Sequence, residues 1–270
     1  MKLATVSAPD GVTRAAVLDG GVWRALPAPD LSAWLRGGRD GTPGQALADW
    51  EPVNPLPTPG KVICCGLNYA EHIAETGRDL PAHPTLFAKH ADTLLGPDQE
   101  IVVPENAAVD WEAELAVVVG APLRRAGQAE AAAAIAGYTV ANDISIRDWQ
   151  KRTLQWFQGK AWDATTPIGP IVVTPEEADP AAGLDISCRV NGEVVQHANT
   201  RTLVFDSPAL LAYISTFTVL RPGDLVLTGT PGGIGAAMDP PRFLADGDIV
   251  ETRIDGIGTL RNRVRLTPST

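Results

Sequence analysis

The chain has 270 residues, of which 44% are hydrophobic and 20% charged, a composition typical of a globular protein with a sizeable core. Its formal net charge of −10 and its pI of about 4.8 argue against nucleic acid and anionic membrane surfaces as partners. Its apolar runs fall short of the roughly 20 residues of a membrane span, and its three cysteines form a poor disulfide framework, so we expect a reduced, cytoplasmic protein.

The first fifty residues are predicted to form short strands and turns. Asp19-Gly20-Gly21 marks a hairpin, and residues 31–38 a short helix that glycine ends. Four prolines in residues 51–61 mark a domain boundary. We therefore expect a small β-rich N-terminal domain over residues 1–55 and a main domain over residues 56–270.

Helices are the minority in the main domain. A buried strand is predicted in residues 61–69, with a short helix after it over 70–77. A helix of strong propensity is predicted over 128–138. Another is predicted over 207–217, with Ser207 as its N-cap and the proline after it at the first helical position.

Most of the remaining elements are predicted to be strands joined by hairpins. Asn191-Gly192 joins two strands within residues 184–198, and the terminal hairpin turns near Asp255-Gly256. Strands connected in this way form a mainly antiparallel sheet, so the predicted fold class is α+β and β-dominated.

Acidic side chains alternate along the segment VDWEAELAVVVG, residues 109–120. On a strand, Asp110, Glu112 and Glu114 share one face at a spacing of about 6.5 Å, next to an aliphatic run that we expect to be buried. Asp143 follows another β-rich run. Such like charges need a cation or water between them, and oxygen ligands suit Mg²⁺, Mn²⁺ or Ca²⁺ better than zinc. A solvated strand edge is the alternative that the spacing leaves open.

Several other side chains could take part in chemistry. His72 and Glu75 lie three apart, so a helix places them on one face, where a carboxylate can orient an imidazole as a general base. An exposed surface pair is the alternative. Arg147 and Gln150 follow Asp143 by four and seven residues and would share its face on a helix that starts there.

The glycine-rich segment TGTPGGIG, residues 228–235, lacks the lysine and the spacing of a phosphate-binding loop. Thr230 and the backbone N–H groups beside it are instead predicted to cradle a carboxylate.

Seven segments, in order, resemble the fumarylacetoacetate hydrolase (FAH) family. They are GLNYAEHIAETG, PTLFAKH, DWEAELAVVVG, GYTVANDISIRDWQ, QGKAWD, VNGEVVQ and LVLTGTPGGIG, spanning about residues 60–262. The resemblance implies an FAH-type mixed β-roll and β-sandwich catalytic domain, a homodimer, and one divalent metal ion, Mg²⁺ or Mn²⁺ with Ca²⁺ as a further option.

The resemblance also implies roles for single residues. The metal ligands would be Glu112, Glu114 and Asp143, with Asp110 in support. The catalytic groups would be His72 oriented by Glu75, on a helix that orders over the substrate, and Lys160. The substrate contacts would be Tyr69, Arg147, Gln150 and Thr230. Lys89 departs from the commoner Lys-Pro of the family because His90 follows it, and its role stays open.

The predicted function is a metal-dependent hydrolase that cleaves a C–C bond of a 3-acylpyruvate-type substrate to pyruvate and a carboxylic acid. Members of the family use the same enolate chemistry to decarboxylate a 2-oxo acid such as oxaloacetate or to isomerise a 2-hydroxydienoic diacid, and these reactions are the alternatives. A non-catalytic metal-binding homologue is a further alternative, against which the presence of His72, Glu75 and Lys160 counts.

Overall fold

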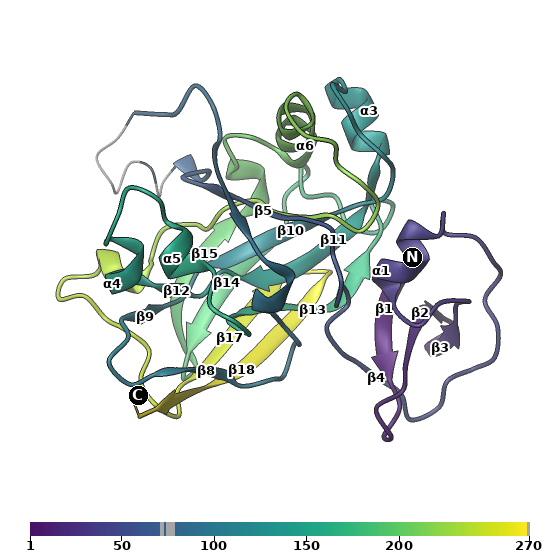
Figure 1. The fold of residues 1–270 in the computed structure, drawn as a ribbon, viewed down its shortest axis with the longest axis horizontal. Helices are drawn as coiled ribbons and strands as arrows, with labels where there is room; N and C mark the ends of the chain where they lie inside the picture. Colours follow the sequence, from purple (N-terminus) through teal and green to yellow (C-terminus); the bar gives the residue numbers. More distant parts are fainter. Residues whose placement is uncertain (71–72, 74–78, 269–270) are drawn as a thin grey trace.

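Two β-sheets organise the computed structural model, which describes residues 1–70, 73 and 79–268 (Figure 1). Within this part of the chain the larger sheet has eleven strands. In hydrogen-bonded order these are β3 (Val22–Ala25), β2 (Thr13–Asp19), β1 (Lys2–Ser7), β13 (Thr166–Val173), β11 (Ile135–Asn142), β10 (Ala113–Val119), β16 (Leu225–Leu227), β5 (Val62–Gly66) and β6 (Thr85–Lys89), with β4 (Glu51–Pro52) on β1 and β7 (Leu94–Leu95) on β13.

The smaller sheet consists of β15 (Glu193–Asn199), β14 (Asp185–Val190), β17 (Ile249–Ile254), β18 (Gly258–Thr267) and β8 (Ile101–Pro104). A separate pair joins β9 (Val109–Asp110) to β12 (Ser145–Ile146). The predicted hairpins at Gly20, Asn191-Gly192 and Gly256 are confirmed, with positive φ at the turn residues. Most strand pairs are antiparallel, as predicted; β5–β16, β7–β13 and β8–β18 are parallel. The β-dominated α+β class is therefore confirmed.

The described helices are short. They are α1 (Leu31–Arg36), α3 (Gln128–Ala133), α4 (Arg147–Gln150), α5 (Phe157–Lys160) and α6 (Ser207–Ser215), with 3₁₀ turns η1 (Ala91–Thr93), η2 (Thr200–Thr202) and η3 (Gly235–Ala237). None of these is long and apolar enough to cross a membrane. The helix predicted over residues 70–77 lies largely outside the described residues.

Two helix boundaries differ from the prediction. The helix over 128–138 is too long, because Ile135 already begins strand β11 and is buried in the core, which outweighs the helix propensity of the alanines. The N-cap of α6 is Asp206 and not Ser207: the Asp206 carboxylate accepts the Ala209 N–H at 2.9 Å, and Ser207 is already helical.

Strand β10 crosses the centre of the fold and is buried on both faces. Leu115 and Val117 pack into a cluster shared with the smaller sheet, whereas Ala116 and Val118 pack into a second cluster that includes Leu31 of α1. Because both faces are covered, the part of the strand after Glu114, residues 115–119, is a continuous buried apolar run, as the sequence predicted.

The N-terminal strands and α1 lie together at one side of the molecule, opposite α4 and α5 (Figure 1). Strand β1 joins the larger sheet through β13, with Lys2 opposite Val173 and Leu3 opposite Val172. The division of the chain into domains at residue 55 stays a prediction.

The segment around the alternating acids is not the single strand that was predicted. It is interrupted at residues 111–112, between β9 and β10. The cause lies in the pairing, because β9 pairs with β12 whereas β10 pairs with β11, and these two partners are themselves separated by residues 143–144. The two strand paths thus break at the same level.

Candidate functional site

Two of the predicted metal ligands lie where the strands are interrupted: Glu112 between β9 and β10, and Asp143 between β11 and β12. Across the gap the Asp143 N–H donates to the Glu112 carbonyl at 2.8 Å. The Glu112 N–H donates to the side-chain oxygen of Asn142 at 2.9 Å. These bonds satisfy backbone groups that the strand ladders leave open, so both acids are fixed in place where the ladders end.

The three predicted metal ligands converge in the interior. One carboxylate oxygen each of Glu112, Glu114 and Asp143 lies within 4.8 Å of the others, and all three residues are buried. Glu114 Oε2 also accepts the Gly229 N–H at 2.6 Å. This N–H is one of those beside Thr230 that were predicted to cradle a substrate carboxylate, so that part of the cradle instead holds the protein's own acid.

Two buried lysines face the same acids. Lys160 Nζ lies 2.6 Å from Glu112 Oε2 and 2.7 Å from Asp143 Oδ2. Lys89 Nζ pairs with the other oxygen of Asp143. Because an ammonium group is costly to bury unless it is paired, these contacts account for both lysines in the interior. Lys89, whose role the sequence left open, is thereby placed beside the acids.

Arg147 connects the acid cluster to a fourth carboxylate, Asp110. Its Nη1 lies 2.7 Å from Glu112 Oε1, and its Nε lies 2.8 Å from Asp110 Oδ2. Asp110 also accepts three backbone N–H groups, those of Trp111 and Gly235 at 2.8 Å and of Ala236 at 3.0 Å. Asp110 thus orients Arg147 and anchors η3, a supporting position.

The charges of this cluster control the pKa values of its members. Burial raises the pKa of Glu112, but Lys160 and Arg147 outweigh it and lower this pKa to about 2. Burial, and then the carboxylates of Asp143 and Glu112, raise the pKa of Glu114 well above its usual range. Burial lowers the pKa of Lys160, but Asp143 and Glu112 outweigh it, so the pKa is raised and the ammonium form is favoured.

A cavity of about 270 Å³ opens onto this cluster. Five of the predicted site residues line it, namely Glu112, Arg147, Gln150, Lys160 and Thr230. Aromatic side chains, Phe87 and Trp156, form part of the wall. The cavity therefore combines charged groups with an apolar lining, which is typical of small-molecule sites.

The remaining predicted site residues are placed differently. Tyr69 is buried, and burial together with the Glu114 carboxylate raises the pKa of its phenol. Its hydroxyl has no hydrogen-bond partner among the described residues. His72 and Glu75 lie outside the described residues, so their predicted roles stay predictions.

Arg147 and Gln150 both come from α4, but this helix begins at Arg147 and not near Asp143 as predicted. Residues 145–146, directly before this helix, form strand β12 because they pair with β9. Arg147 Nη1 donates to Gln150 Oε1 at 3.0 Å, so the two side chains do meet. Asp143 reaches them from the strand break and not along a shared helix face.

Sequence reasoning did not assign a role to Gln196, which is 1% exposed and bonded to Thr230. The signal was present, because this residue ends the segment VNGEVVQ that contributed to the family resemblance. Its side chain comes from the smaller sheet, and only the folded arrangement brings it beside Thr230 of the cavity wall.

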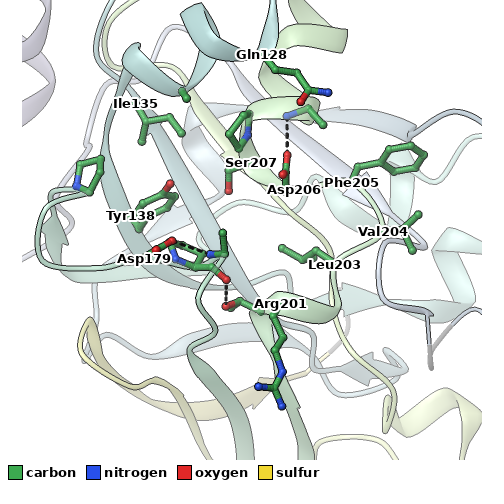
Figure 2. A pocket seen from close by; sticks show the side chains of 17 residues that line it. Gln128, Ile135, Tyr138, Asp179, Arg201, Leu203, Val204, Phe205, Asp206 and Ser207 are labelled. Atoms are coloured by element: carbon green, nitrogen blue, oxygen red, sulfur yellow. Dashed lines mark hydrogen bonds between the residues drawn. The ribbon is translucent and has the colours of Figure 1, made fainter.

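A larger pocket of about 670 Å³ lies near α3 and α6 (Figure 2). Its two carboxylates are occupied locally: Asp206 caps α6, and Asp179 accepts the Ala181 N–H at 3.0 Å. The Thr200 hydroxyl donates to the Pro180 carbonyl at 2.8 Å. These polar groups stabilise the wall, so the smaller cavity beside the acid cluster is the candidate functional site.

The donor set beside that cavity fits a hard divalent cation. All three converging ligands are carboxylates, the oxygen donors that Mg²⁺ and Mn²⁺ prefer. Burial raises the pKa of Glu114 first, and repulsion by the carboxylates of Asp143 and Glu112 raises it further; a cation at this place would offset that repulsion. The residues present therefore match the metal site that the sequence predicted.

Metal affinity should depend on pH through Glu114. Burial and the neighbouring carboxylates raise the pKa of Glu114, so protons compete with the ion for this carboxyl group, and Mn²⁺ affinity should fall as pH is lowered. Titration calorimetry in buffers of different ionisation enthalpy should detect proton release on Mn²⁺ binding. Glu114→Gln should abolish binding, whereas the surface variant Glu100→Gln should not. Unchanged binding and proton release in Glu114→Gln would contradict the assignment.

Removing Asp110 should destabilise the fold. Asp110→Ala removes one of the two carboxylates that pair with the buried Arg147 guanidinium and leaves three backbone N–H groups without their acceptor, which should lower the free energy of unfolding by about 3–5 kcal/mol. The control Asp255→Ala removes an exposed pair with Arg253 and should cost no more than about 0.5 kcal/mol. Urea denaturation measures both; equal losses would refute the scaffold role.

The comparisons with known proteins agree with this geometry. Residues 61–265 match the family described as fumarylacetoacetate (FAA) hydrolase C-terminal. Oxaloacetate tautomerase Fahd2a, mitochondrial, of Rattus norvegicus is 45% identical over 212 residues, covering 78% of this chain and 68% of that protein. The structure of 5-carboxymethyl-2-hydroxymuconate delta-isomerase from Mycobacterium smegmatis has 35% identity and a TM-score of 0.84, with 100% of each chain covered. That of the fumarylacetoacetate hydrolase from Exiguobacterium antarcticum has 32% identity and a TM-score of 0.88, covering 99% of this chain and 100% of that one. The chain belongs to the fumarylacetoacetate hydrolase family.

Proposed function

We propose that this protein is a divalent-metal-dependent enzyme that interconverts the enol and keto forms of a 2-oxo dicarboxylate of the oxaloacetate type. The observation that carries the proposal is an unused donor beside the buried acids. Arg147 Nη2 is buried without a hydrogen-bond partner among the described residues, and Arg147 lines the cavity. A buried guanidinium N–H of this kind suits the carboxylate of a ligand.

The printed names of two relatives support this choice of reaction. One is called an oxaloacetate tautomerase and the other a delta-isomerase of a hydroxymuconate. Both reactions move a proton through an enol or enolate of a 2-oxo acid. The proposal therefore favours the isomerase-type alternative from the sequence over C–C bond hydrolysis.

Glu112, Glu114 and Asp143 would hold the metal ion, for which we propose Mg²⁺ or Mn²⁺. When bound, such an ion supplies Lewis-acid stabilisation of negative charge on oxygen. Lys160 supplies further positive charge, because its raised pKa keeps it an ammonium group instead of a base. Its place in the buried wall strengthens its attraction for an enolate oxygen.

The other end of the substrate would meet α4 and the segment after β16. Arg147 Nη1 donates to Gln150 Oε1 at 3.0 Å, and both residues line the cavity together with Thr230. These groups bind and orient a carboxylate, so that the carbon next to the 2-oxo group is placed for proton transfer.

The proton acceptor is a separate question. Glu112 has a pKa lowered to about 2 and Cys65 a pKa raised to about 12, so neither lining residue exchanges protons readily near neutral pH. We assign this role to His72, oriented by Glu75, as the family resemblance implies.

Hydrolysis of a 3-acylpyruvate remains the second candidate, because one structural relative of high similarity is a fumarylacetoacetate hydrolase. It uses the same enolate stabilisation and differs in needing an activated water molecule, for which His72 would be the base. Decarboxylation of oxaloacetate needs the enolate alone. The homodimer and the cytoplasmic location stay predictions.

Lys160→Met should slow ketonisation of enol-oxaloacetate by about 100-fold or more, since it removes the ammonium group that stabilises the enolate. The absorbance of the enol, followed with Mg²⁺ present, measures this rate. The control Arg265→Met removes one positive charge from an exposed pair and should keep the wild-type rate.

The same proteins should be assayed for acetylpyruvate cleavage and for decarboxylation. If the wild-type enzyme cleaves acetylpyruvate but does not accelerate the ketonisation of enol-oxaloacetate, the hydrolase interpretation is restored. Full tautomerase activity in Lys160→Met would refute the role of the lysine.

A further inference from the structure

Gln196 joins three segments that form different parts of the site. It lies in β15 of the smaller sheet and is 1% exposed. Its Oε1 accepts the N–H of Ala113, the residue between the ligands Glu112 and Glu114, at 2.9 Å. Its Nε2 donates to Thr230 Oγ1 and to the Pro231 carbonyl, both at 2.9 Å. Every hydrogen of this amide is therefore used.

The orientation of the amide follows from its partners. The Ala113 N–H can only donate and the Pro231 carbonyl can only accept, so the oxygen must face Ala113 and the nitrogen must face Pro231 and Thr230. Thr230 Oγ1 consequently accepts a hydrogen bond from Gln196. Its own hydrogen is then directed away from the amide.

The hydroxyl hydrogen of Thr230 has no acceptor among the described residues. Because Thr230 is part of the cavity wall, this hydrogen is available to a ligand there. The segment around it is also held close to β15. A Cβ on Gly233 would lie 2.1 Å from the Val195 carbonyl oxygen, so the backbone approaches β15 too closely for any other residue. The amide and the hydroxyl thus have little freedom to separate.

We propose that Gln196 is a positioning residue that makes Thr230 a hydrogen-bond donor to a ligand carboxylate or oxyanion in the cavity. This inference rests on the proposed function, because it assumes an anionic ligand there. Gln196 does not line the cavity itself and acts through Thr230. The same amide ties Thr230 to Ala113, the residue between the acids Glu112 and Glu114, which keeps the donor in register with them.

The test is a double-mutant cycle on binding instead of turnover. Titration calorimetry measures the affinity of oxalate, an unreactive planar dianion, with Mg²⁺ present, for the wild type, Gln196→Met, Thr230→Val and the double variant. Each single change should lower the affinity for oxalate by about tenfold, the contribution of one hydrogen bond to a charged group. The double variant should bind oxalate no more weakly than Thr230→Val does. Thr230→Ser, which keeps the hydroxyl, should bind as the wild type does.

A purely structural role would give a different result. Losses that multiply in the double variant, or normal oxalate binding in Gln196→Met, would overturn the inference. If Gln196→Met does not fold, Gln196→Asn takes its place, since it keeps a polar amide but is one methylene shorter and so draws the amide nitrogen away from Thr230, and the same cycle applies. A wild type that does not bind oxalate would overturn the proposed function together with the inference, whereas multiplicative losses on a wild type that binds would overturn the inference alone.

Discussion

Repulsion between buried carboxylates is the constraint on which the rest of this structure depends. Glu112, Glu114 and Asp143 bring like charges within a few ångströms of one another in the interior, where water does not screen them. The neighbouring lysines and Arg147 offset part of this charge, but burial, together with the carboxylates of Asp143 and Glu112, still raises the pKa of Glu114. A further cation at this place would offset the remaining negative charge.

The fold meets this constraint by interrupting two strand paths at one level. Side chains in a regular ladder would place alternate acids about 6.5 Å apart along one face. The break lets Glu112 and Asp143 turn toward Glu114 while side-chain and backbone bonds satisfy the open peptide groups. The strand beyond the break, β10, is buried on both faces, which makes it a rigid support for ligands that must hold their positions.

Local patterns in the sequence predicted much of this. Turn residues located the hairpins, and the apolar run after Glu114 predicted a strand covered on both faces. The alternating acids pointed to a cation site, and the family resemblance supplied the ligand roles and Lys160; the structure does bring these residues together. The strand break could not be predicted, because it depends on which partner each segment finds. The predicted end of α3 was wrong for a similar reason, because the burial of Ile135 in a sheet outweighs the helix propensity of a run of alanines. Gln196 and Lys89 reach the site from distant segments, so only the tertiary arrangement reveals their partners.

The central claim is that a 2-oxo acid loses and regains a proton beside the acid cluster. Proton NMR of 2-oxoglutarate, a 2-oxo dicarboxylate that is stable to spontaneous decarboxylation, in D₂O with Mg²⁺ tests it most directly, because each enolisation toward C3 exchanges a C3 hydrogen for deuterium. We expect the wild type to accelerate loss of the C3 signal and a chelator or the Glu114→Gln change to abolish the acceleration. Exchange that continues at the wild-type rate under either condition would contradict the account.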